Sequence, residues 1–298
     1  MILGRNNHRN WVHDMDRVFI DGEFTLAPPP FSQVLWFLSS VQNTCFPWCT
    51  LCYPTNAKKH TMNYSDLSKR CGHFSIQRRS LLTLRWQGMN SVRQAFPRAE
   101  HHGCLFHLTK SMKRQLSENG LLQRYNAEPR FVLHARMINA LAFAPTDNLD
   151  DAFDALSNQL ANELTTIMNR LEDNYIGRPG RDNRRSRPAL FPPGIWSMYQ
   201  RTISGIDKTN NHAEAAHRCL KRELDLVHPS IWKFIDGLHR VQKGRDVTYE
   251  QYVCGEPGPV KRREYILVDQ RPLTTVNNYN NRDIIKYLRG IAHNFLME

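Results

Sequence analysis

The sequence predicts a mixed α/β protein in which a mixed β-sheet carries helices on its faces. Three apolar segments, 17–26, 33–39 and 46–53, follow one another near the N-terminus and favour a strand meander. Two more short strands are predicted at 80–84 and 103–107, with helical segments between them. Beyond residue 130 the apolar residues recur mainly at helical spacing. This order of elements is typical of a sheet flanked by helices.

Apolar periodicity, together with glycine and proline as stop signals, locates the helices. We predict helices at 63–70, 88–96, 108–119, 131–144, 149–171, 212–224, 231–241 and 283–295, a solvated loop at 177–188 and a strand at 264–268. The pattern suits a ribonuclease-H-like core interrupted by a helical insertion. The expected parts are a core (1–129 and 189–245), a helical insertion that ends in an arginine-rich loop (130–188) and a C-terminal extension (246–298).

The composition limits the class of protein. Of the 298 residues 41% are hydrophobic, which is enough to bury a substantial core. No stretch approaches the roughly 18 apolar residues of a membrane span, and the polar N-terminus lacks the apolar region of a secretory signal. The seven cysteines are an odd number in a long chain, as expected where thiols stay reduced. We expect an intracellular protein with no membrane partner.

The net charge of +12 predicts a polyanionic partner. Nucleic acid is the first candidate and an anionic membrane surface the second. The alternative is a basic surface with no dedicated partner, because net charge bears on association and not on fold.

The stretch VFIDGEF, residues 18–24, allows two interpretations of Asp21. Asp-Gly between apolar segments is the strongest short-range signal for a tight hairpin. An aspartate at the end of a buried strand is also a common metal ligand in phosphoryl-transfer enzymes. The local pattern by itself favours the turn.

Five segments occur in an order that is similar to the Mutator-like (MULE) transposase domain family. They are FIDGEF followed by APPPFSQV, then AFPRAEHHGCLFHLTKSM, MINALAFAP, KTNNHAEAAHRCLKREL and HPSIWKFIDGL, over roughly residues 17–240. The resemblance implies a DDE-type ribonuclease-H-like core in which three acidic residues bind two Mg²⁺ or Mn²⁺ ions for DNA cleavage and strand transfer. It also implies double-stranded DNA as partner, a homo-oligomer and a nuclear location, or a cytoplasmic one for a non-functional fragment.

Two positions match the family's acids. Asp21 matches the first and Glu214 the third, and both would be catalytic metal ligands. Without the resemblance, Glu214 would be an ordinary surface residue in the first turn of a helix, where the helix dipole favours it.

The second acid is missing from its expected place at the end of the fourth strand. That place falls on Thr83-Leu84-Arg85, and no aspartate occurs between Asp66 and Asp147. The intervening glutamates, Glu100, Glu118 and Glu128, do not end this strand. We therefore expect an impaired or inactive enzyme. The alternatives are a non-catalytic DNA-binding or scaffolding protein and a degenerate or partial gene copy, because the chain starts only a few residues before the first core strand.

Cys104 and His107 resemble the family's Cys-x-x-His element, in which sulfur and imidazole could share one Zn²⁺. Two ligands do not complete a tetrahedral site, so His101, His102 or His217 would have to join them. A buried cysteine beside a helix-capping histidine is the alternative.

The remaining candidates are basic and aromatic. The expected phosphate contacts are Arg178, Arg181, Arg184, Arg185, Arg187 and Lys208, with Lys261-Arg262-Arg263 as a second basic run. A charge run can also be a solvated face or a nuclear-localisation patch. Trp196 and Trp232 lie in apolar surroundings and are predicted to be core residues.

Overall fold

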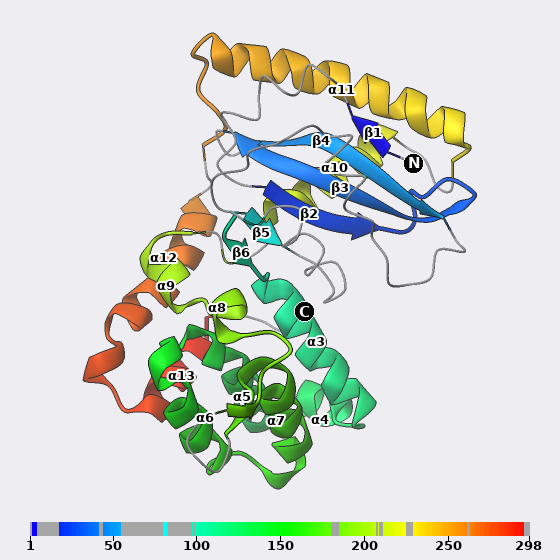
Figure 1. The fold of residues 1–298 in the computed structure, drawn as a ribbon. Helices are drawn as coiled ribbons and strands as arrows, with labels where there is room; N and C mark the ends of the chain where they lie inside the picture. The colour runs from blue at the N-terminus through cyan, green and yellow to red at the C-terminus, as the bar shows by residue number, and fades with distance from the viewer. Residues whose placement is uncertain are drawn as a thin grey trace. The chain divides into compact units, whose positions relative to one another are not determined.

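The computed structural model describes residues 2–4, 18–41, 44–54, 80–82, 97, 99–179, 185–206, 208, 211–224, 229–260 and 263–294. The chain divides into two compact units (Figure 1). Unit 1 comprises residues 1–102 and 210–261, and unit 2 comprises residues 103–209 and 262–298. The segment expected as a helical insertion, 130–188, falls within unit 2, together with the residues on either side of it and the end of the chain.

A mixed sheet forms the centre of unit 1. Its strands are β1 (Ile2–Gly4), β2 (Val18–Glu23), β3 (Phe31–Val41), β4 (Thr44–Pro54), β5 (Ser80–Leu82) and β6 (His101–His102). They lie in the order β1-β4-β3-β2-β5-β6. The pairs β2–β3, β3–β4 and β1–β4 are antiparallel, whereas β5 runs parallel to β2 and to β6. The mixed α/β class and the three-strand meander are therefore confirmed.

The link between β2 and β3 shows that Asp21-Gly22 is not a hairpin turn. Both residues lie inside β2, with Asp21 opposite Trp36 and Gly22 opposite Leu35. The chain reverses farther on, at 24–30, where the amide of Phe31 donates to the carbonyl of Pro28 at 2.8 Å. Proline has no amide hydrogen for a strand ladder, and the three consecutive prolines, residues 28–30, lie in this connection outside the strand pairing.

Two helices, α10 (Asn211–Leu224) and α11 (Ile231–Val253), cover one face of this sheet. The shared core contains side chains from both layers: Phe19, Leu26, Ala27, Val34, Trp36, Leu38, Cys52, Leu220, Leu224, Phe234 and Val241. Within it, the rings of Trp36 and Phe234 lie 6.3 Å apart in a tilted arrangement. Apolar burial of this kind is the main source of stability for the layer.

The position of Trp232 in α11 contradicts the core prediction. Its side chain is 74% exposed, whereas Phe234 is completely buried. The hydroxyl of Ser230 caps the helix by accepting from the amide of Lys233, which fixes where the first turn begins. The buried face then falls on Phe234, and Trp232 points away from it. The helix also continues past Gly244, the predicted stop.

Unit 2 is helical. Its helices are α3 (Leu105–Glu118), α4 (Leu122–Ala127), α5 (Pro129–Ala140), α6 (Leu149–Ser157), α7 (Thr165–Leu171), α8 (Pro193–Trp196), α9 (Tyr199–Ile203), α12 (Arg263–Asn277) and α13 (Ile284–Ala292). A π-helical turn (Glu172–Ile176) follows α7, and β7 (Arg178–Pro179) pairs antiparallel with β8 (Arg185–Arg187). In the core, α13 packs on α5, and the buried hydroxyl of Tyr287 donates to the carbonyl of Phe143. Trp196 is buried, as predicted.

Four predicted elements of unit 2 were wrong. In place of the strand at 103–107, Gly103 and Cys104 lead directly into α3, because Leu105 continues the buried stripe of Leu108 and Met112. The single helix at 149–171 is two helices that bury their apolar residues in the same core. The loop at 177–188 contains the pair β7–β8, and the strand at 264–268 is the first part of α12. A short apolar run does not distinguish strand from helix.

Two other predicted helices are found in the structure, and two lie outside the described residues. The helices expected at 212–224 and 283–295 correspond to α10 and α13, and α3 ends just before Gly120, which has φ 71°. The helices expected at 63–70 and 88–96 lie outside the described residues. Among the helices that the structure describes, none is long and apolar enough to cross a membrane.

Candidate functional site

Asp21 lies next to the described part of the parallel pairing of β2 with β5. The described register runs from Val18 opposite Ser80 to Ile20 opposite Leu82, and Asp21 is the next residue of β2. Its carboxylate Oδ1 accepts from the amide of Gly22 at 2.8 Å, and the side chain is partly buried. A Cβ on Gly22 would meet the amide end of the Gln33 side chain, which is long enough to turn aside.

Helix α10 lies on the same face of the sheet as Asp21. Phe19 points into the core that contains Leu220 and Leu224 of α10. Side chains two residues apart in a strand share a face, so Asp21 is directed to the face that α10 covers. Helix α10 also contacts β2. Glu214 lies in the first turn of this helix. The structure thus brings together the two elements that carry the predicted first and third acids.

The position of the predicted second acid follows directly on β5. That strand is described as far as Leu82, and Thr83, Leu84 and Arg85 lie outside the described residues. Among the residues that are described, no group of three or more His, Cys, Asp or Glu side chains is placed to hold a metal ion. A carboxylate such as that of Asp21 is a hard oxygen ligand of the kind that Mg²⁺ prefers. The side chain of Glu214 lies outside the described atoms.

Cys104 and His107 lie at the start of α3. Cys104 is buried at the N-cap position, and the ring of His107 stands perpendicular to that of Phe106 at 5.6 Å. The imidazole of His102, which is buried in β6, lies 3.3 Å from the carboxylate of Glu100. The described side chains give Cys104 and His107 no third zinc ligand. The side chain of His217 lies outside the described atoms.

The arginine-rich segment forms a two-stranded ribbon rather than a loop. Arg178 of β7 lies opposite Arg187 of β8, and Pro179 lies opposite Arg185. Arg181 and Arg184, between the strands, lie outside the described residues. Lys208 is partly buried elsewhere in unit 2, where its carbonyl accepts from the amide of Leu105 at 2.9 Å. The ribbon is therefore a built element and not only a run of charge.

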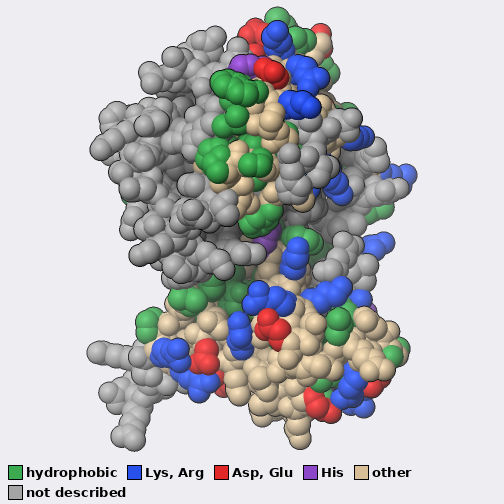
Figure 2. Space-filling model, turned by 90° about the vertical axis from the view of Figure 1, so that its right-hand side faces the viewer, with side chains coloured by type: hydrophobic (Ala, Val, Ile, Leu, Met, Phe, Trp, Pro, Cys, Tyr) green, Lys and Arg blue, Asp and Glu red, His purple; other side chains and the backbone are tan. Residues whose placement is uncertain are grey.

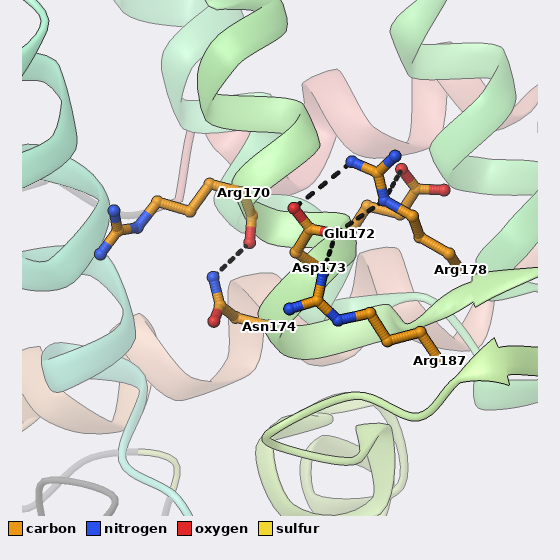
Figure 3. Close-up of polar contacts among 6 residues, drawn as sticks. All are labelled: Arg170, Glu172, Asp173, Asn174, Arg178 and Arg187. Carbon is orange, nitrogen blue, oxygen red and sulfur yellow. Dashed lines mark hydrogen bonds and ion pairs between the residues drawn. The ribbon is translucent and has the colours of Figure 1, made fainter.

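Two acidic residues of the π-helical turn contact the base of this ribbon (Figure 3). Arg178 donates from Nε to Oδ1 of Asp173 at 2.6 Å and from Nη2 to Oδ2 at 3.3 Å. Arg187 Nη1 lies 3.6 Å from the same Oδ1, and Glu172 lies 3.8 Å from Arg178 Nε. The hydrogen bonds that Arg178 donates to Asp173 raise the pKa of Arg178. Asp173 thus holds the two facing arginines at once.

Backbone and aromatic contacts fix both ends of the ribbon. Gly177 enters β7 with φ 89°, a conformation that favours glycine. On the other side, the amide of Phe191 donates to the carbonyl of Asn174 at 2.7 Å, and its ring stacks on Tyr175 at 5.1 Å. The indole of Trp196 donates to the carbonyls of Tyr175 and Phe191. Burial raises the pKa of Tyr175. The ribbon therefore projects from a firmly packed base.

Sequence reasoning found the arginines but missed the acids that hold them. The signal was present in Glu172-Asp173, which come shortly before Gly177-Arg178. Acids and arginines so close in sequence can pair across a turn. The space-filling view shows Lys and Arg side chains in several separate groups, some of them beside an acidic side chain (Figure 2).

Comparisons of the chain with protein-family models, with curated proteins and with solved structures found no match. The resemblance to MULE transposases rests on the five ordered segments of the sequence.

Proposed function

We propose that this chain is a DNA-binding protein of the MULE transposase type, with a ribonuclease-H-like core in unit 1 and impaired metal-dependent cleavage and strand transfer. The observation that carries the proposal is the position of Asp21 on β2, the strand that pairs in parallel with β5 and contacts α10, the helix that contains Glu214. The strand order supports it as well. A three-strand meander continues into β5 and β6, which run parallel to the meander's first core strand.

The chemistry of the proposed site depends on carboxylates. A bound Mg²⁺ or Mn²⁺ would offset the charge that develops on phosphate oxygens during cleavage. Asp21 and Glu214 would hold the ion through hard oxygen ligands. Thr83 offers a hydroxyl in place of the second carboxylate, and Arg85 brings a cation close by in sequence. Two of three carboxylates should bind the metal weakly, which is why we propose impairment.

Restoring the missing acid tests this proposal. Calorimetry with Mn²⁺ and cleavage of labelled duplex DNA would compare the natural chain with Thr83→Asp, Asp21→Asn and the double variant. We expect Thr83→Asp to increase Mn²⁺ affinity and cleavage, and Asp21→Asn to cancel both gains. If Thr83→Asp leaves Mn²⁺ affinity unchanged, the proposed acidic site is refuted. Rapid cleavage by the natural chain that Asp21→Ala abolishes would refute impairment only.

The second candidate is a non-catalytic DNA-binding or scaffolding protein. The ribbon β7–β8 favours it, because its arginines belong to unit 2 and do not depend on the acids of unit 1. On this reading, duplex DNA binding is salt-sensitive and tolerant of sequence, and Asp21→Asn does not change it.

Sedimentation of the purified chain with and without DNA would test the proposed homo-oligomer. Imaging of a tagged chain would test the proposed nuclear location.

A further inference from the structure

The negative charge of Asp173 lies at the base of the ribbon β7–β8, in contact with Arg178 and Arg187. We propose that this ribbon is the surface of unit 2 that contacts duplex DNA, and that Asp173 competes with DNA phosphates for Arg178 and Arg187. The inference rests on the DNA binding proposed above, but it assigns that binding to one element and gives it an internal regulator.

The geometry of the contact supports exchange between carboxylate and phosphate. Two nitrogens of Arg178 face the two carboxylate oxygens of Asp173, at 2.6 and 3.3 Å. A guanidinium group binds a phosphate through the same planar fork. A phosphate group could therefore take the place of Asp173 without a change in the ribbon itself.

The exposure of Arg178, Arg187 and Asp173 bears on whether a DNA phosphate can displace the carboxylate from the arginines. The side chains of Arg178 and Arg187 are 47% and 70% exposed, and that of Asp173 is 29% exposed. The guanidinium groups are thus open to an outside anion while they remain in contact with the acid. An ion pair this exposed is weak, so a polyanion that releases counterions can displace it.

The net charge and the shape of the ribbon favour duplex DNA as its partner. Residues 177–188 contain five arginines and one acid, Asp182, so the segment carries a net positive charge even before a partner binds. A two-stranded ribbon is one of the elements that fit the major groove of B-form DNA. The packed base of Tyr175, Phe191 and Trp196 would hold the ribbon in one orientation. These features favour duplex DNA over a single small anion.

Matched substitutions test the inference by fluorescence anisotropy with a labelled duplex over a series of salt concentrations. The variants are Arg178→Gln/Arg187→Gln and Asp173→Asn. The controls come from a similar exposed cluster, in which Arg124 bonds Glu128 at 2.8 Å and Glu163 at 2.7 Å. Arg124→Gln and Glu163→Gln change the net charge of the protein as a single ribbon substitution does, but away from the ribbon. Arg178→Lys keeps the charge, and circular dichroism checks the fold of each variant.

We expect the double arginine variant to lower the slope of log affinity against log salt by about 1.8, from about 0.9 for each lost phosphate contact. Asp173→Asn should tighten binding roughly two- to five-fold, the range in which an exposed ion pair competes, and Arg178→Lys should keep the slope. If the ribbon variants match the Arg124→Gln and Glu163→Gln controls, the inference fails and DNA binding elsewhere on the chain stands. If the natural chain does not bind the duplex, both the inference and the proposed function fail.

Discussion

Arg178 lies directly opposite Arg187 in the ribbon β7–β8, and both guanidinium groups reach the carboxylate of Asp173. Like charges that face each other across two strands are destabilising. One carboxylate between them offsets this repulsion. The pairing thus connects the stability of the ribbon with its suitability for an anionic partner.

Removing that carboxylate should loosen the ribbon. For Asp173→Asn we expect faster tryptic cleavage between residues 177 and 188, with little change in global unfolding, because an exposed ion pair contributes little to global stability. Timed trypsin digestion followed by mass spectrometry measures this. Glu163→Gln, which removes an acid from the Arg124 cluster, should leave cleavage within this segment unchanged. Equal cleavage rates in both variants would refute the stabilising role of Asp173.

Two neighbouring aromatic residues of α11 should differ sharply in their effect on unit 1. Phe234 is fully buried against Trp36, so Phe234→Ala should destabilise unit 1 by about 3–5 kcal/mol through the loss of buried surface and the cavity left behind. Trp232 is 74% exposed, so Trp232→Ala should change stability by no more than about 0.5 kcal/mol. Urea unfolding followed by circular dichroism distinguishes them. A large effect of Trp232→Ala would contradict the observed orientation of α11.

The hydroxyl group of Tyr287 should contribute to the stability of unit 2. It is buried and donates to the carbonyl of Phe143, and burial raises its pKa far above the usual range. Tyr287→Phe leaves that carbonyl without its partner, which should cost about 1–3 kcal/mol. Tyr279, whose ring packs perpendicular to that of Tyr287 at 4.8 Å, supplies the control Tyr279→Phe. Thermal unfolding of unit 2 should show a clear decrease for the first variant and a smaller one for the second.

Acid should weaken unit 2 through His134. Burial, with the nearby charges of Arg130 and Arg289, lowers the pKa of this histidine in the folded chain. The unfolded chain therefore takes up the proton first, and the stability present above about pH 6.5 declines as the pH falls below that value. Denaturant unfolding at about pH 7.5 and about pH 5.5 should show the decline, and His134→Gln should reduce it. Arg130→Gln should reduce it in part, whereas an unchanged decline in both variants would exclude His134 as its source.

The spacing of apolar residues predicted a helix or strand correctly where the regularly spaced residues are also the ones that are buried. The meander strands and α10 were found in this way, since their apolar residues repeat at the spacing of the final structure. The start of α3 and the break between α6 and α7 were missed. In both places the same apolar residues fit more than one element, and only packing against other helices selected one.

The candidate site shows the same division. Asp21 and Glu214 were predicted from the resemblance to the MULE transposase family, and the arginines from the run of charge. The sequence left Asp21-Gly22 open between a turn and the strand predicted at 17–26, and the choice depends on β3, which supplies the pairing partners from more than ten residues away. It also could not show that Asp173 lies between Arg178 and Arg187.

The amino-acid sequence by itself determined the charge, the helical and strand periodicity and the absence of an acid at Thr83-Leu84-Arg85, the expected place of the second acid. Tertiary structure alone decided that β5 runs parallel to β2, that α10 covers the face toward which Asp21 is directed, and that Trp232 is exposed while Phe234 is buried. The physical reason is that periodicity records which residues are apolar, whereas strand direction and the choice of buried face depend on contacts between segments far apart in the chain.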